Sequence, residues 1–321
     1  MANQKIAGMS MKGGRKDKFF FCLLEYFPEH ERWALKSLLQ LKDESGIDRE
    51  DIVRNWIEKF EVKDLVVDFP LSEPACHPCS LDCPGITNCE VEEVKNINDL
   101  ITELIKEDQR LADENPKRYE QKRNSHDEID YSRDVFHKES HEHILSRSFK
   151  RRLKKGYLPY WNRPIDLWVW NFYYDQLLDL FNSSYDSFGN TSLMILSRFS
   201  YLRRHFPSDL KLYESFGPII LIELLRSGII KKKHIQNFND IELGIETRID
   251  LVQKIEKEAN LFIYDHDFEV LIKNPHAFDS FMLALSGMQS LSGMARDLPI
   301  WTRPKETSFL VPNFSLDKDK P

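Results

Sequence analysis

Four of the five cysteines stand close together in the chain, in a pattern typical of metal binding. They follow the spacing C-x2-C-x3-C-x5-C and are Cys76, Cys79, Cys83 and Cys89. Four thiolates at short spacing can surround one Zn2+ ion tetrahedrally, and such a closed site has a structural role. An iron–sulfur cluster uses the same ligands, and four unliganded buried cysteines are a further alternative. The pattern predicts a structural zinc site, with Cys22 expected in the core.

Three carboxylates lie where a folded chain would ordinarily avoid them. Asp68 ends the apolar run LVVD, Glu214 ends the strand-like run KLYE, and Asp279 lies in a largely apolar helix. A buried, unpaired carboxylate is costly, so such groups are normally paired or bound to metal. Acids at the carboxyl ends of strands in an open α/β sheet also lie where such sheets bind ligands. We therefore treat these three as candidate catalytic residues.

Each carboxylate also has a structural explanation. Asp68 could cap the loop that follows it, and Glu214 could cap the helix that follows it. Asp279 could pair with His276, three residues earlier on the same helix face. Residue types alone do not separate these alternatives from catalysis.

A basic and aromatic segment covers residues 147–163, RSFKRRLKKGYLPYWNR. Cations for phosphates beside rings for stacking bases suit single-stranded nucleic acid. The net charge of -7 excludes a generally basic surface, so nucleic-acid binding would need this local patch. A solvated helix face followed by a docked loop is the alternative. The candidate nucleic-acid-binding residues are Arg147, Lys150, Arg151, Arg152, Lys154, Lys155 and Arg163.

The elements that would position these residues form an α/β pattern. Strands are expected at 5–11, 18–26 and 33–41, as an antiparallel meander. A helix at 48–60 and a buried strand at 64–68 follow, which indicates a mixed sheet covered by helices. The region 106–147 is highly charged with little periodicity, and the tail from 301 is expected to be extended. Further expected elements are helices at 91–105, 166–181, 191–205, 241–259 and 275–287, and a strand at 210–214 followed by a helix through 225.

The composition is that of an ordinary globular protein, with 41% hydrophobic and 30% charged residues. The longest apolar run, FFFCLL, is too short to span a bilayer, so no membrane partner is expected. The N-terminal residues lack the apolar core of a secretory signal. We expect a cytoplasmic protein with one domain over 1–321, interrupted by a cysteine insertion at 73–91 and a charged, helical insertion at 92–188.

The order of several short motifs resembles the ribonuclease-H-like fold, and more closely the predicted-nuclease family catalogued as domain-of-unknown-function family 429. The similar stretches run from about residue 6 to 291, and the cysteine segment is an addition to the family pattern. They are GMSMKGG at 8–14, VDFPL at 67–71, YWNRPID at 160–166, residues 190–203, LYESFGP at 212–218, GIETR at 244–248 and FDSFMLAL at 278–285.

The resemblance implies phosphodiester hydrolysis with two Mg2+ or Mn2+ ions, to which carboxylates from the first strand, the central strand and a late helix are ligands. By position, Asp68 would be the central-strand ligand, Asp279 the helix ligand, and Glu214 an auxiliary or water-positioning group. It also suggests that Arg163 pairs with Asp166 near the site, or contacts a phosphate. The first-strand aspartate, however, falls on Ser10.

Serine is a weak, neutral metal ligand, so the departure at Ser10 leaves three outcomes open. The chain has lost catalysis, uses one ion, or recruits Glu25 or Asp17. Two functions are therefore expected as alternatives. One is a metal-dependent nuclease or a degenerate descendant of one, and the other is a non-catalytic, zinc-stabilised scaffold that binds nucleic acid or protein.

Overall fold

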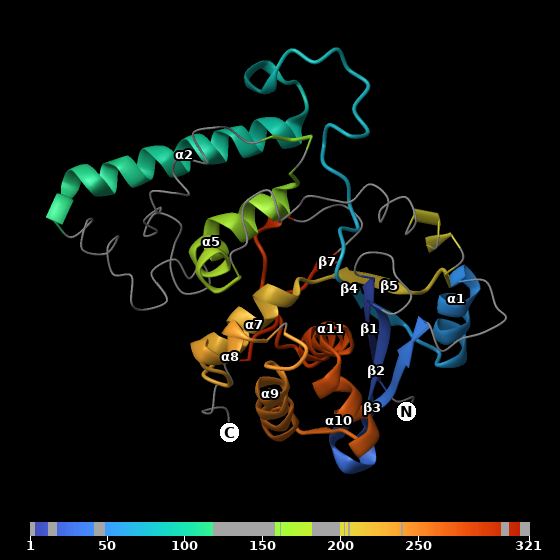
Figure 1. The fold of residues 1–321 in the computed structure, drawn as a ribbon. Coiled ribbons are helices and arrows are strands. Elements are labelled where there is room, and N and C mark those ends of the chain that lie inside the picture. The colour runs from blue at the N-terminus through green and yellow to red at the C-terminus, as the bar shows by residue number, and fades with distance from the viewer. Residues whose placement is uncertain are drawn as a thin grey trace. The chain divides into compact units, whose positions relative to one another are not determined.

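The computed structural model describes residues 4–11, 18–41, 49–117, 158–160, 162–181, 200–201, 203–204, 206–238, 240–302 and 308–314 (Figure 1). The chain divides into two compact units. Unit 1 comprises Met1–Leu71, Ser192–Arg296 and Lys305–Pro321, and unit 2 comprises Ser72–Thr191 and Asp297–Pro304. The two ranges expected as insertions, 73–91 and 92–188, both fall within unit 2.

Unit 1 is built on a seven-stranded mixed sheet with the order β6-β3-β2-β1-β4-β5-β7. The strands β1 (Lys5–Met11), β2 (Phe19–Phe27) and β3 (Arg32–Gln40) form the expected antiparallel meander. The strands β4 (Asp64–Val67) and β5 (Lys211–Glu214) continue the sheet in parallel. The prediction of a mixed α/β sheet is confirmed.

Two short strands at the sheet edges had no signal in the sequence. They are β6 (Leu261–Phe262), which pairs with β3, and β7 (Ser308–Phe309), which pairs with β5. Strands of two residues are too short to show alternation, so only pairing with an existing strand defines them.

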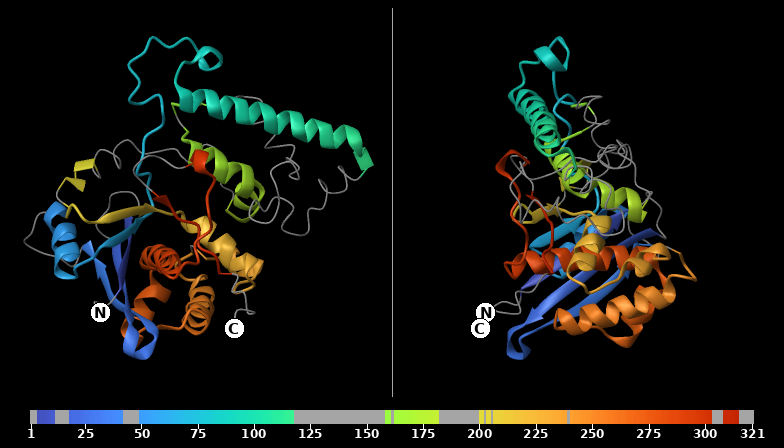
Figure 2. Two further views of the ribbon diagram at one scale, coloured as in Figure 1. Left: turned by 180° about the vertical axis from the view of Figure 1, so that it is seen from behind. Right: turned by 90° about the vertical axis from the view of Figure 1, so that its left-hand side faces the viewer.

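Alternation along β1 sends its side chains to two different helices. Ala7, Met9 and Met11 join a core cluster with side chains of α1 (Arg49–Lys59). The other face, which includes Gly8 and Ser10, lies against α11 (Pro275–Leu291). Figures 1 and 2 show α1 on one side of these strands and α11 on the other.

The contact between β1 and α11 is close because Gly8 has no side chain. A Cβ atom there would lie 2.1 Å from the Ser280 carbonyl oxygen and 2.3 Å from the Ala284 nitrogen. A Cβ atom on Gly287 would lie 2.5 Å from Ile6 at the start of the strand. The helix therefore runs antiparallel to β1, and its first turns lie towards the carboxyl end of the strand.

The remaining helices of unit 1 follow β5 and β6. The expected helix after β5 is α7 (Gly217–Arg226), and the expected amphipathic helix is α9 (Ile245–Glu258). Two helices were not anticipated, α8 (Lys232–Gln236) and α10 (Asp265–Lys273). A short 3-10 helix, η3 (Pro28–His30), joins β2 to β3. The helix expected at 191–205 falls largely outside the described residues.

Arg248 of α9 links several backbone segments of these helices through buried hydrogen bonds. It is fully buried, and its guanidinium donates to the carbonyl oxygens of Phe238, Asp240, Ile241 and Ile272 at 2.7–2.8 Å. Gly244 leaves the room for it, because a Cβ atom there would lie 2.4 Å from the guanidinium. The GIETR stretch thus has a structural role, because Arg248 connects the loop before α9 to the end of α10.

Unit 2 contains the helices α2 (Glu92–Glu114) and α5 (Pro164–Phe181) and the 3-10 helices η5 (Ile86–Asn88) and η9 (Ile300–Thr302). α2 is longer than the expected 91–105, because ion pairs from Arg110 to Glu107 and Glu114 support its charged last turns. α5 begins at Pro164, a residue suited to a first helical position. Among the described residues, no helix is long and apolar enough to cross a bilayer.

Candidate functional site

Ser10 and Asp68 meet across the parallel pair β1 and β4. The Ser10 hydroxyl donates to Asp68 Oδ2 at 2.6 Å, and the Met11 amide donates to Asp68 Oδ1 at 3.3 Å. Ser10 is fully buried. Asp68 follows Val67, the last residue of β4, so the carboxylate lies at the carboxyl edge of the sheet. The β1 position next to Asp68 therefore supplies a hydrogen-bond donor to this carboxylate.

Asp279 comes to the same face from α11. Its helix begins at Pro275 after Asn274, whose side chain caps it by accepting from the amides of His276 and Ala277. The carboxylate is 13% exposed, and its Oδ1 lies 3.9 Å from where a Cβ atom on Gly217 would be, just beyond β5. Since Ser10 and Asp68 also face α11, these three residues share one face and one edge of the sheet.

His276 accompanies Asp279 as the sequence alternative expected. Its Nδ1 lies 3.7 Å from Asp279 Oδ2, an ion pair when the imidazole is protonated. Within the described part of the chain, this buried nitrogen has no hydrogen-bond partner. The imidazole as a whole is 25% exposed, so it has access to solvent. A histidine in this position can hold a proton beside the candidate acid, a role that the sequence pattern did not indicate.

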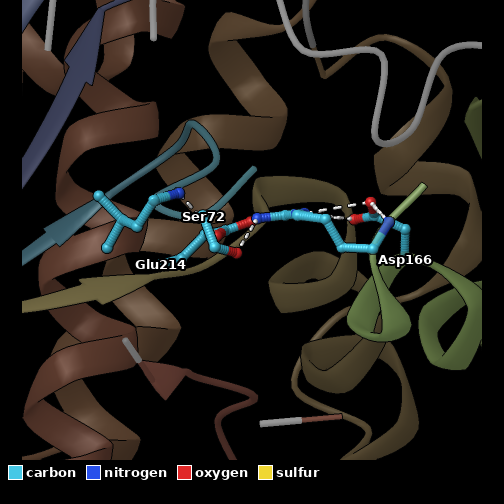
Figure 3. Close-up of polar contacts among 5 residues, drawn as sticks. Ser72, Asp166 and Glu214 are labelled. Atoms are coloured by element: carbon cyan, nitrogen blue, oxygen red, sulfur yellow. Dashed lines mark hydrogen bonds and ion pairs between the residues drawn. The ribbon is translucent and has the colours of Figure 1, made fainter. Parts of the chain in front are cut away.

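The side chain of Glu214 lies on the opposite face of the sheet, towards α1. It pairs in register with Val67, whose side chain belongs to the core cluster with α1. Residues paired directly across parallel strands share a face, whereas Asp68 is one residue further along and faces α11. Glu214 Oε2 accepts from the Leu71 amide at 3.1 Å (Figure 3). The structure thus gives Glu214 a role in holding the loop after β4, and does not group it with Ser10, Asp68 and Asp279.

The suggestion that Glu25 acts as an acidic ligand in place of Ser10 is wrong. It pairs with Lys5 at the far end of β1, roughly 16 Å from Ser10 at about 3.3 Å per residue. Its carboxylate lies 3.6 Å from the Lys36 ammonium. The other suggested replacement, Asp17, lies outside the described residues.

Arg163 and Asp166, at the start of α5 in unit 2, form the expected pair. The guanidinium Nη2 lies 2.7 Å from Asp166 Oδ1, and Nη1 donates to the Ser72 hydroxyl at 3.4 Å (Figure 3). Asp166 Oδ2 also accepts the Arg163 amide at 2.8 Å, which caps the helix. The two side chains are 3% and 0% exposed, and this burial favours a structural role over a phosphate contact. The other predicted nucleic-acid-binding residues, 147–155, lie outside the described residues.

The four clustered cysteines are unpaired and lie in unit 2. Cys76 and Cys89 are half-buried, and Cys79 and Cys83 are exposed. Burial raises the pKa of the Cys76 thiol, and the nearby thiols of Cys89, Cys79 and Cys83 raise it further. Cys22 is fully buried in β2, as expected, and burial raises its pKa well above the usual value.

The described residues hold no group of three or more His, Cys, Asp or Glu side chains already arranged to hold a metal ion. The donors at the edge of β1 and β4 still suit one hard ion by type, because Asp68 and Asp279 offer carboxylate oxygens. They do not suit a pair of ions, since Ser10 donates its hydroxyl hydrogen to Asp68 instead of offering a second charge.

Comparisons with models of known protein families, with curated proteins and with solved structures gave no match to this chain. A proposal about the function of this chain therefore rests on its own structure. The relevant part is the edge of the sheet in unit 1, where Ser10, Asp68 and Asp279 share a face.

Proposed function

We propose that unit 1 is a ribonuclease-H-like phosphodiester hydrolase domain that works with one Mg2+ or Mn2+ ion, held by Asp68 and Asp279. The observation that carries the proposal is the shared position of Ser10, Asp68 and Asp279, which are far apart in the sequence. The strand order supports it as well. The run β3-β2-β1-β4-β5, with β2 antiparallel to its neighbours and β1, β4 and β5 parallel, is a mixed sheet of the kind that the resemblance implies.

The residues at this edge have separate roles in the proposed reaction. Asp68 is oriented by two donors, the Ser10 hydroxyl and the Met11 amide, so its carboxylate is held in place before any substrate binds. A bound cation would polarise a phosphoryl oxygen and make a water molecule more acidic. Asp279 supplies the second carboxylate, and Glu214 positions the backbone of the loop beside Asp68.

His276 is suited to proton transfer in this site. Its Nδ1 is turned towards Asp279, and its ring has access to solvent. An imidazole beside the candidate acid can pass a proton to a leaving oxygen. The expected substrate is nucleic acid, with the basic segment 147–155 contributing phosphate contacts.

A second function is supported by the same serine. Because Ser10 occupies one oxygen of Asp68 with a 2.6 Å hydrogen bond, the site is also what a degenerate nuclease would retain after losing its first acid. In that case the chain binds nucleic acid or protein without cleaving it, as a scaffold.

Cleavage assays on the full chain separate the two functions. Labelled single-stranded, duplex and hybrid nucleic acids are incubated with Mg2+ or Mn2+ and with the parent, Asp68→Asn or Asp279→Asn. We expect cation-dependent cleavage by the parent and a loss of about a hundredfold or more in either variant, because each change removes one charged ligand. Asp250→Asn is the matched control, since Asp250 is 59% exposed on α9 and should leave the rate unchanged.

Cleavage that survives both Asp68→Asn and Asp279→Asn would refute the proposed site. If the parent does not cleave but binds nucleic acid in a salt-sensitive manner, and binding is lost when the Lys and Arg residues of 147–155 are replaced, the scaffold function is correct.

A further inference from the structure

The segment at residues 75–91 is a part of unit 2 that folds without a hydrophobic core. All of its residues are described, and none of them is buried. Its one regular element is the 3-10 helix η5 (Ile86–Asn88), and Leu81 is 57% exposed. Chain segments of this size that cannot bury apolar side chains usually need a disulfide or a metal ion to become ordered. The four cysteines of this segment form no disulfide, so their thiols could serve as ligands to a metal ion.

The backbone of the segment turns between Cys76 and Cys79 and again just before Cys89. The Cys79 amide donates to the Cys76 carbonyl oxygen at 3.4 Å, which brings the first two cysteines onto one turn. The Cys89 amide donates to the Ile86 carbonyl oxygen at 3.4 Å at the end of η5. Gly85, between Cys83 and Cys89, has φ at 86°, a conformation that L side chains rarely adopt.

The candidate ligands in this segment are the four cysteine sulfurs, because the nearby histidine already has a partner. His77 is the histidine nearest in sequence, but its Nδ1 lies 2.6 Å from Glu73 Oε2. Four thiolates without an imidazole or an open position form a closed, soft site, which suits Zn2+.

We propose that Cys76, Cys79, Cys83 and Cys89 bind one Zn2+ ion, and that this ion orders residues 75–91 and fixes the start of α2. The helix begins at Glu92, three residues after the last ligand, and its first buried residue is Val94. At the other end, the Cys76 amide donates to the Pro159 carbonyl oxygen at 3.1 Å, shortly before α5. The ion therefore ties the entry of α2 to the chain that leads into α5, within unit 2.

Metal analysis of the purified full chain tests the site. We expect about one equivalent of zinc per chain, released when a mercurial reagent blocks the thiols. Replacement of the zinc by Co2+ should produce the intense visible absorption of a tetrahedral tetrathiolate site. Cys79→Ser and Cys83→Ser, both at exposed positions, should lower the zinc content below half an equivalent. Cys22→Ala is the matched control, because this cysteine lies in the core of unit 1 and should leave the zinc content unchanged.

Less than half an equivalent of zinc in the parent would overturn the proposal, as would full zinc retention in Cys83→Ser. Stoichiometric iron and sulfide would overturn it in favour of an iron–sulfur cluster. The parent measurement requires no variant to fold, and neither readout depends on nuclease activity. Failure here and failure of the proposed hydrolase are therefore distinguishable.

Discussion

The hydroxyl of Ser10 determines what Asp68 can do at the edge of the sheet. A second carboxylate at 2.6 Å from Asp68 would be unstable without a cation, since two carboxylates about 3 Å apart cannot both ionise. Serine removes that repulsion and replaces it with a hydrogen bond to a charged acceptor, which contributes about 1.5–3 kcal/mol. The Ser10 hydroxyl thus stabilises the charged form of Asp68 without adding a second charge at this edge.

Ser10→Asp should create a cation-dependent pair of acids with Asp68. Without divalent cations, we expect the free energy of unfolding to fall by about 3 kcal/mol, because Ser10 is fully buried. Mg2+ or Mn2+ should then raise the melting temperature of the variant more than that of the parent, because the cation binds the folded state alone. Thermal denaturation with and without each cation measures the effect.

Ser10→Asn is the control for the added bulk, since its side chain has the shape of aspartate without the charge. Equal cation responses of the aspartate and asparagine variants would show that no ion binds beside Asp68.

At the scale of elements, the helix α11 brings Asp279 to the strands that carry Ser10 and Asp68. The helix approaches β1 closely at Gly8, where its backbone occupies the space that a side chain would fill. Its entry is set by the Asn274 cap and by Pro275 at the first position. The place of Asp279 therefore depends on a glycine in a different element.

Gly8→Ala should destabilise unit 1 markedly. The new methyl group would lie 2.1 Å from the Ser280 carbonyl oxygen, so helix and strand must move apart. We expect the free energy of unfolding, measured by chemical denaturation, to fall by about 3 kcal/mol.

Gly217→Ala is the matched control, because the nearest atom to its Cβ position, Asp279 Oδ1, is 3.9 Å away. It should change the free energy by less than about 1 kcal/mol. Similar losses in both variants would contradict the close packing of α11 on β1.

At the scale of the whole molecule, the two units are stabilised by different means. Unit 1 has a sheet with a buried helix or core cluster on each face. Unit 2 combines the aromatic helix α5, in which Trp168 and Tyr173 are fully buried, with the coreless segment 75–91. Loss of a metal ion should therefore affect unit 2 selectively.

Removal of zinc with a zinc-selective chelator should loosen residues 75–91 and the first turns of α2. Amide hydrogen exchange followed by mass spectrometry should show faster exchange there, with unchanged protection in β1, β2 and α11. Addition of zinc should reverse the change. Equal acceleration in β1, or unchanged exchange in 75–91, would contradict a zinc-dependent segment in unit 2.

Local patterns were sufficient to predict the main elements of the fold. The strands β1 to β5 and the helices α1, α7, α9 and α11 lie within a few residues of their expected bounds. Each has its own signal, either alternation, an apolar run or a capped helical period. The edge strands β6 and β7 lack such a signal, because two residues become a strand only through a partner far away in the sequence.

Residue types and spacing by themselves determined which groups could do chemistry in this protein: four thiols in one short segment, and three acids that end strands or lie in an apolar helix. Only the tertiary structure decided which of them meet. It brought Ser10 and Asp68 within hydrogen-bonding distance and Asp279 to the same face, and it directed Glu214 to the other face. The physical reason is that register between strands and the packing of α11 depend on contacts between distant residues, which a local pattern does not contain.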